Sequence, residues 1–185
     1  MYPFLRFHLG NRRARRMAPL GLFDVHVSHH RCMPLDIDPW VELNNGRTLT
    51  LYDLGRMQLA VRAGMVPVLR NKGWGIAVAG VSVRYRRRIR VFERFTMTTR
   101  LLGWDARFLY LDQALWKGGE CANQMLLRWA VTGPEGIVPT AKVAAAIGHD
   151  GSSPALPDWV QAWITAEATR PWPPDLPGFA PQQPA

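Results

Sequence analysis

The stretch that decides the fold consists of four apolar segments with the character of β-strands. They read WGIAVAGVSVRYRRR (74–88), VFERFTMTTRLLG (91–103), RFLYLDQALW (107–116) and CANQMLLRWAVT (121–132). β-branched and aromatic residues are frequent in them, and a helical period is absent. The breaks are short, and Gly118-Gly119 suits a two-residue hairpin turn. This pattern predicts an antiparallel meander.

One long helix is predicted before the meander, after a strand over residues 23–33. Asn44 or Asn45 can cap it, and Gly64 and Pro67 should end it after ~16 residues, or about 24 Å. Its stripe at intervals of three and four is Leu49, Tyr52, Arg56, Met57, Ala60 and Ala63. A bent sheet that wraps this helix buries the apolar faces of both. The prediction is therefore an α+β fold, an antiparallel sheet around one long central α-helix.

A chain of 185 residues is long enough for one folded domain. We expect residues 1–22 to be a basic N-terminal extension and residues 23–148 to form the domain. Residues 149–170 should be a linker and a C-terminal amphipathic helix over 157–168, because Trp159, Val160, Trp163 and Ile164 recur at helical spacing. The Pro-rich tail, residues 171–185, is expected to be extended or disordered.

The positive charge is concentrated in two clusters of arginines. Lysine and arginine exceed aspartate and glutamate by nine. Residues 1–16 carry Arg6, Arg12, Arg13, Arg15 and Arg16 with no acid, and the second cluster is Arg84, Arg86, Arg87, Arg88 and Arg90. The second cluster indicates either a local anionic partner, such as the phosphates of CoA, or a solvated face. No ordered recognition motif accompanies the arginines, so nucleic acid is not the expected partner.

Cysteine usage and hydropathy place the chain in a reducing, aqueous compartment. No apolar run approaches the ~20 residues of a membrane-spanning helix, and the first ten residues do not resemble a secretory signal. Cys32 and Cys121 are therefore expected to be free thiols in the cytoplasm. His26, His29 and His30 lack a second convergent cluster, so no metal is expected. No motif supports a covalent serine or cysteine mechanism.

The segment with the clearest chemical potential is DIDPWVELNNGR, residues 36–47. Hydrolysis of a thioester needs a base or nucleophile beside the carbonyl carbon and donors for the developing oxyanion. Asp38, just before the helix, could activate water. The unpaired N–H groups of the first helical turn could bind the oxyanion, aided by the positive end of the helix dipole.

The Asp-Ile-Asp run, with Asn-Asn starting at the sixth residue after Asp38 and then a helix with Tyr52, Asp53 and Arg56, resembles a known family signature. It is similar to that of the 4-hydroxybenzoyl-CoA thioesterase-like superfamily, and the similarity covers roughly residues 24–147. Val81-Ser82-Val83-Arg84-Tyr85-Arg86-Arg87 looks like the family's second strand, and Val138-Pro139 like the segment after its last strand. The resemblance implies a hotdog fold, and it places the catalytic aspartate at Asp38.

The chain departs from the family pattern at two positions of this segment. The resemblance places an assisting histidine of some members at Asn45. In the family pattern a glycine-histidine pair leads from the two aspartates to the paired asparagines, and Glu42 stands where that histidine is usual. Asn45 could orient water or the carbonyl, or it could only cap the helix, and Asn44 is a weaker candidate for substrate contact. Glu42 could share a proton with Asp38 or be a solvated loop acid. Asp53 could contact the ligand or pair with Arg56 or Arg47.

The leading hypothesis is an acyl-CoA thioesterase that releases a free acid and CoA, with Asp38 as general base or nucleophile. No cofactor is expected, since CoA is part of the substrate. Arg84, Arg86 and Arg88 share a face of an uninterrupted strand, and they are predicted to hold the CoA phosphates. The alternative is a non-catalytic hotdog module that binds an acyl thioester or a protein partner. The resemblance also implies a homodimer or homotetramer whose site is built from two protomers.

Overall fold

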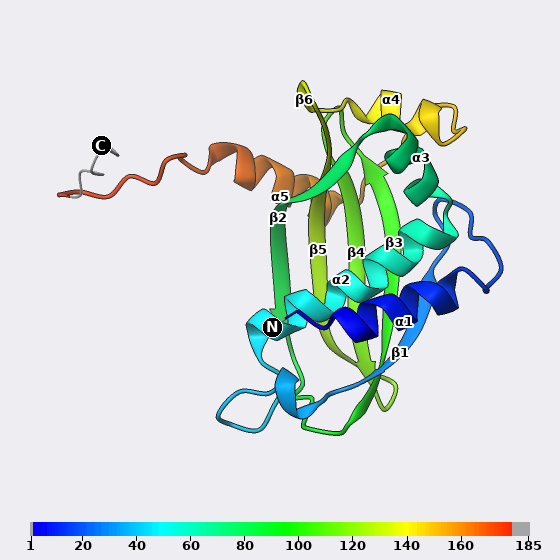
Figure 1. Cartoon of the computed structure of the whole chain (residues 1–185). Coiled ribbons are helices and arrows are strands. Elements are labelled where there is room, and N and C mark those ends of the chain that lie inside the picture. Colours follow the sequence, from blue (N-terminus) through cyan, green and yellow to red (C-terminus); the bar gives the residue numbers. More distant parts are fainter. Residues whose placement is uncertain (1, 179–185) are drawn as a thin grey trace, which may run out of the picture. The chain divides into compact units, whose positions relative to one another are not determined.

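The structure, a computed structural model, describes residues 2–178 and contains two compact units, Met1–Ala155 and Leu156–Ala185 (Figure 1). The first unit begins with helix α1 (Phe4–Ala14), strand β1 (His26–Arg31), the 3-10 turn η1 (Pro34–Asp36), helix α2 (Asn45–Arg62) and helix α3 (Met65–Lys72). It continues with strands β2 (Gly75–Tyr85), β3 (Arg94–Trp104), β4 (Leu109–Lys117), β5 (Glu120–Gly133) and β6 (Gly136–Ile137), and with helix α4 (Thr140–Ala146). No helix in the described part of the chain is both long and apolar enough to cross a membrane.

The strands form one antiparallel sheet in the order β1-β3-β4-β5-β2, and β6 pairs with β5. The predicted meander is confirmed for β3, β4 and β5, and Gly118 and Gly119 turn between β4 and β5 with φ values of 57° and 84°. The prediction was wrong for β2, which pairs with β5 and not with β3. The place beside β3 is taken by β1, in the register His26 opposite Thr99. Strands β1 and β2 are therefore the two edges.

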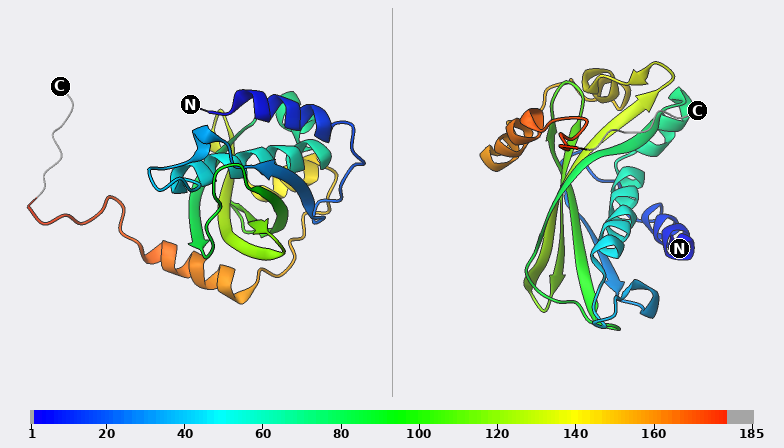
Figure 2. Two further views of the ribbon diagram at one scale, coloured as in Figure 1. Left: turned by 90° about the horizontal axis from the view of Figure 1, so that it is seen from below. Right: turned by 90° about the vertical axis from the view of Figure 1, so that its left-hand side faces the viewer.

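The curled sheet holds α2 against its concave side, as the view from below shows (Figure 2). Leu51, Leu54 and Leu59 of α2 are buried in one core with apolar residues of β3, β4 and β5. The helix can approach β3 closely because Gly55 has no side chain; a Cβ there would collide with Met97 and Thr99. These contacts confirm the predicted sheet around one long helix.

The helix ends as predicted at Gly64, whose φ of 71° lies in the left-handed region that favours glycine. Pro67 does not end it, contrary to the prediction. Pro67 lies in the first turn of α3, where its missing N–H leaves no helical hydrogen bond unmade. Helix α1 lies within the segment expected to be a basic extension, and its apolar spacing was not recognised.

The second unit contains helix α5 (Asp158–Thr169), which confirms the helix predicted over residues 157–168. Asp158 lies in its first turn, where the helix dipole favours a carboxylate. Residues 171–178 contain no helix or strand. The rest of the Pro-rich tail, residues 179–185, lies outside the described residues.

Candidate functional site

Asp36 of the Asp-Ile-Asp motif ends η1, and Ile37 and Asp38 lie in a small hairpin between η1 and α2. Ile37 pairs with Leu43, and the amide of Asp38 donates to the carbonyl of Glu42 at 2.9 Å. Asp38 and Glu42 are therefore opposite each other, and opposed residues of an antiparallel pair point to the same face. Val41, at the tip, has a φ of 61°, which a β-branched residue rarely adopts. The hairpin thus brings two carboxylates to one side of the loop before α2.

Asp38 uses only one of its carboxylate oxygens within the hairpin. Oδ1 accepts the amide N–H of Trp40 at 2.9 Å and, at the limit of a hydrogen bond, that of Glu42 at 3.5 Å. Oδ2 has no donor among residues 2–178, and the side chain is half-buried. The Oδ1 bonds are those of a residue that orders a turn. The free oxygen leaves Asp38 able to accept a proton from water.

Asp36, the first aspartate of the motif, is structural. It is 1% exposed and forms ion pairs with Arg6 at 2.6 Å and with Arg47 at 2.7 Å. Its carboxylate also accepts the amide N–H of Met33 at 3.0 Å. Burial alone would raise the pKa of Asp36, but the hydrogen bonds from Arg47, Met33 and Arg6 hold this pKa below its usual value. Asp36 therefore stays ionised and ties α1, η1 and α2 together.

The first turn of α2 offers donors for an oxyanion. The side chain of Asn44 caps the helix by accepting the amide N–H of Arg47 at 3.0 Å, so Asn44 is the cap and Asn45 the first helical residue. The amides of Asn45 and Gly46 have no acceptor within the described residues. Both residues are exposed, and both amides lie at the positive end of the helix. They are the donors that an oxyanion hole requires.

A pocket beside this helix end collects several predicted site residues. It is lined by Glu42, Leu43, Asn45, Thr48, Tyr85, Arg86, Arg87, Arg88, Ile89 and Asn123. Across it, Glu42 and Arg88 form an ion pair at 3.1 Å. The hydroxyl of Tyr85 donates to the carbonyl of Asn45 at 3.3 Å. The carboxylate of Glu42 is therefore held beside the basic connection that follows β2, and Asp38 does not line this pocket.

The predicted common strand face of Arg84, Arg86 and Arg88 is wrong. Strand β2 ends at Tyr85, because the amides of Arg86 and Arg87 both turn to donate to the carbonyl of Ala122, at 2.8 and 2.9 Å. Arg84 remains on the strand, opposite Gln124. Arg86 and Arg88 instead line the pocket in the connection to β3, and Arg87 pairs with Glu120 at 3.0 Å.

Asp53 lies outside the pocket and forms an ion pair with Arg56, one of the two structural alternatives. Arg56 is buried and also donates to Gln113 of β4 at 3.0 Å. Beside it, the hydroxyl of Tyr52 donates to Oδ1 of Asn123 at 2.5 Å. The sequence analysis did not select Asn123 as a site residue. The feature that could have indicated it is a polar residue at a buried position of an otherwise apolar strand. It is the residue through which Tyr52 reaches the pocket wall.

The histidines of β1 lie apart from this pocket. His26 is fully buried and accepts a hydrogen bond at Nδ1 from Arg62, at 3.0 Å. Burial and the positive charge of Arg62 lower the pKa of His26 to about 4. His30 is stacked on Phe95, and burial together with the positive charge of Arg6 lowers the pKa of His30 to about 4 as well. No cluster of three or more metal-binding side chains occurs among residues 2–178.

The neutral His26 should make folding stability depend on pH. The unfolded chain binds a proton near pH 6.5 and the folded chain only near pH 4, so stability falls as the pH falls through this window. From pH 7 to pH 5 we expect a loss of about 2 kcal/mol from this residue, measured by urea unfolding. The His26→Gln variant should show a shallower dependence. Equal slopes for wild type and His26→Gln would contradict this explanation.

Comparison with known proteins decides the family. The model of the thioesterase-like superfamily matches residues 32–164. The chain belongs to this superfamily. Protein THEM6 of Xenopus laevis is 31% identical over 134 residues, which are 71% of this chain and 63% of that protein. Protein THEM6 of Drosophila melanogaster is 32% identical over 91 residues, 49% of this chain and 47% of that protein. This thioesterase-like chain thus matches about half to two thirds of the length of these relatives.

Solved structures show the fold of this superfamily member. The probable thioesterase YbaW of Escherichia coli superposes with a TM-score of 0.61 and 13% identity, over 68% of this chain and 96% of YbaW. Slr0204, a 1,4-dihydroxy-2-naphthoyl-CoA thioesterase of Synechocystis, superposes with a TM-score of 0.59 and 8% identity, over 67% of this chain and 95% of that chain. These likenesses, with the superfamily match, confirm the predicted hotdog fold.

Proposed function

We propose that this thioesterase-like protein hydrolyses acyl-CoA thioesters to a free acid and CoA. The observation that carries the proposal is the hairpin before α2. Within residues 2–178, it presents Asp38, with one carboxylate oxygen that has no donor, on the same face as Glu42, and it leads into a helix whose first two amides have no acceptor. A base and an oxyanion hole are the two devices that hydrolysis of a thioester requires.

The reaction follows from these groups. Asp38 takes a proton from a water molecule as the water oxygen bonds to the thioester carbon. The carbonyl oxygen becomes an oxyanion, which the amides of Asn45 and Gly46 stabilise. The carbon–sulfur bond then breaks, the CoA thiolate takes up the proton that Asp38 holds, and the acid and CoA are released with Asp38 again a carboxylate. Glu42 is a second carboxylate on the same face, and Arg88 fixes its position.

The basic connection after β2 supports CoA as the leaving group. Arg86, Arg88, Arg90 and Lys117 surround a second pocket next to the first, together with Arg87, Glu93 and Glu120. Arginine binds phosphate through paired N–H donors, and three phosphates are present on CoA. We place the CoA phosphates here, beside the pocket of Glu42 and Asn45.

The double variant Arg86→Gln/Arg88→Gln should raise KM for an acyl-CoA by about tenfold or more, because charge-assisted bonds to phosphate are lost. A CoA-free thioester should show a much smaller change in KM. Arg84→Gln is the matched control, since Arg84 is an exposed arginine of the same region outside both pockets. Equal changes in KM for the two thioesters would contradict the phosphate site.

A non-catalytic module that binds an acyl thioester is the second candidate. Glu42 favours this non-catalytic candidate, because Glu42 stands where the resemblance to the family places a histidine. Purified protein should be screened against short, long and aromatic acyl-CoAs, with release of free thiol as the measurement. Thiol release from any of them supports hydrolysis. Binding of an acyl-CoA without thiol release supports the module.

We propose further that the protein acts as a homo-oligomer, at least a dimer, in the cytoplasm. Strand β2 is an edge strand with exposed apolar residues, among them Val78 at 52% and Val81 at 39% exposure. Such an edge pairs readily with a second copy. Light scattering should give at least twice the chain mass of 20.9 kDa, and Val81→Lys should lower it. The free thiols of Cys32 and Cys121 support a reducing compartment.

A further inference from the structure

Helix α1 is fixed to the body through one face. Ala14 is buried, and Phe7 packs against the core. Arg6 is tied to Asp36, and a Cβ at Gly10 would meet Nε2 of Gln58 at 2.6 Å. These residues recur at intervals of three and four, so they share one side of the helix. The opposite side of α1 therefore has a defined orientation away from the core.

That opposite side, which we call the outer face, combines apolar and basic residues. Its members are Phe4, Leu5, Leu9, Arg12 and Arg13 of the helix, and Arg15 and Arg16 directly after it. Phe4, Leu5 and Leu9 are 62%, 72% and 57% exposed. The four arginines are exposed, and they form no ion pair within residues 2–178. No acidic residue occurs in residues 1–16.

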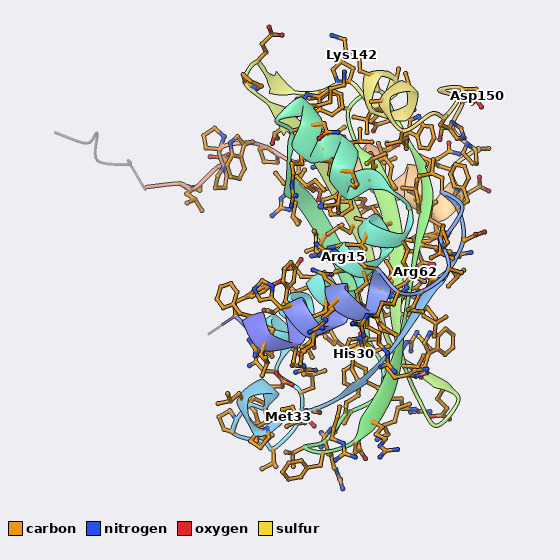
Figure 3. The ribbon with its side chains drawn as sticks, turned by 45° about the vertical axis from the view of Figure 1, so that its right-hand side comes forward. Arg15, His30, Met33, Arg62, Lys142 and Asp150 are labelled. Atoms are coloured by element: carbon orange, nitrogen blue, oxygen red, sulfur yellow. The ribbon has the colours of Figure 1, made fainter. Side chains whose placement is uncertain are left out.

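A groove runs between α1 and β1, beside the outer face. Leu9 and Arg13 of the outer face line it together with Arg6 and Gly10 of the inner side, and Val27 and Arg31 line it from β1. No acidic side chain lines it in the described part of the chain. Figure 3 shows Arg15 and Met33 on the side of the molecule that carries α1. The mixture of apolar and positively charged side chains therefore extends beyond the helix.

We propose that the outer face of α1 binds the surface of an anionic lipid bilayer. Phe4, Leu5 and Leu9 enter the boundary between headgroups and acyl chains, and the arginines bind the lipid phosphates. The helix has 11 residues and is about 16 Å long, about half the thickness of the hydrocarbon core. It therefore lies on the membrane and does not span it.

Charge and apolarity together favour a membrane over the other partners of this face. A second copy of the chain docked on the same face would bring arginines against arginines. A nucleic acid would use the arginines and could stack on Phe4, but it gives the exposed Leu5 and Leu9 nothing to bury against. An anionic bilayer satisfies the charge and covers all three apolar side chains. This surface is separate from the pocket at the start of α2, so the inference does not depend on the proposed hydrolysis.

The test is co-sedimentation of the full chain with vesicles. Phosphatidylcholine vesicles with about one third phosphatidylserine should bind the wild type, and pure phosphatidylcholine vesicles should bind it much more weakly. The variant Arg12→Gln/Arg13→Gln/Arg15→Gln/Arg16→Gln should bind at least about tenfold more weakly, since each arginine near the surface contributes roughly fivefold. The variant Phe4→Ser/Leu5→Ser/Leu9→Ser should also lose most of its binding.

The matched control removes the same charge elsewhere, in Arg70→Gln/Lys72→Gln/Arg107→Gln/Lys142→Gln, all exposed residues. This control should bind the anionic vesicles like the wild type. An equal loss in the control, or no binding by the wild type, would overturn the proposal. Arginine-dependent binding of random RNA that is tighter than vesicle binding, and insensitive to the apolar variant, would assign the face to nucleic acid. Thermal melts of each variant separate loss of binding from loss of fold.

Discussion

Replacing Asp38 with asparagine should lower the rate of thioester hydrolysis by ~10²- to 10⁴-fold, the usual cost of removing a positioned base. The amide keeps an oxygen that can accept the N–H of Trp40, the bond that Oδ1 makes at 2.9 Å. The hairpin and ligand binding should therefore be preserved. Asparagine cannot take a proton from water or attack carbon, so the chemical step alone is lost. The measurement is kcat from thiol release, with binding checked by thermal shift.

Glu42→Gln is the control for Asp38→Asn, because both residues lie on one face of the same hairpin. Its effect on kcat should be smaller, since Glu42 is held by Arg88 at 3.1 Å. An Asp38→Asn variant that retains more than about a tenth of the wild-type rate would show that the base is elsewhere. Glu42 would then be the next candidate. Asp53 is less suited, because it is paired with Arg56 outside the pocket.

A wild-type protein that binds an acyl-CoA in a thermal-shift assay but releases no thiol would reassign the site. Asp38 would then be a residue that orders the hairpin, a role that its Oδ1 bonds already fill. The phosphate site at Arg86 and Arg88 would remain a binding site. Measuring both acyl-CoA binding and thiol release on the wild-type chain therefore distinguishes hydrolysis from non-catalytic binding.

Replacing Asp36 with alanine should lower the free energy of unfolding by about 3 kcal/mol, the size expected when one partner of a buried ion pair is removed. Asp36 is 1% exposed, and its loss removes the acceptor of the bonds from Nη1 of Arg6, Nε of Arg47 and the amide of Met33. Urea unfolding measures the change. For a chain of this length we expect a fall in Tm of about 10 °C.

Asp36→Asn separates charge from shape, because the amide keeps the size of the side chain and one acceptor oxygen. It should destabilise the fold less than Asp36→Ala. The stabilisation from Asp36 should also be lost at low pH, because the pKa of its carboxyl is lower in the folded chain than in the unfolded chain. The contribution to stability is complete above the unfolded pKa of about 4. It disappears as the pH falls through the lower pKa of the folded chain. A loss below about 1 kcal/mol in Asp36→Ala would contradict the structural role.

The elements that the sequence predicted are those with strong local signals. The apolar segments with the character of β-strands became β3, β4 and β5, and the helical stripe became α2, capped by Asn44 and ended by Gly64. These features depend on propensity, period and turn chemistry within a few residues. The family resemblance added the hotdog arrangement, which the superfamily match and the solved structures confirm.

Spacing along the chain could not separate the roles of nearby residues. Asp36 and Asp38 are two residues apart, yet Asp36 is buried between Arg6 and Arg47, while one carboxylate oxygen of Asp38 has no donor in the described part of the chain. Their difference depends on Arg6, thirty residues away on α1, and on how α1 packs.

The sequence alone therefore determined the long helix, a cap at Asn44 or Asn45, and the strands β3, β4 and β5 of the meander, because hydrogen bonds and apolar periods between near neighbours specify them. Tertiary structure alone decided that β2 lies at the far edge of the sheet, that Arg86 and Arg88 line a pocket with Glu42, and that Asp53 pairs with Arg56. In the first two cases the contacts join residues far apart in the chain. In the third, the local pair is selected because Arg56 is buried against Gln113 of β4, which no local pattern can specify.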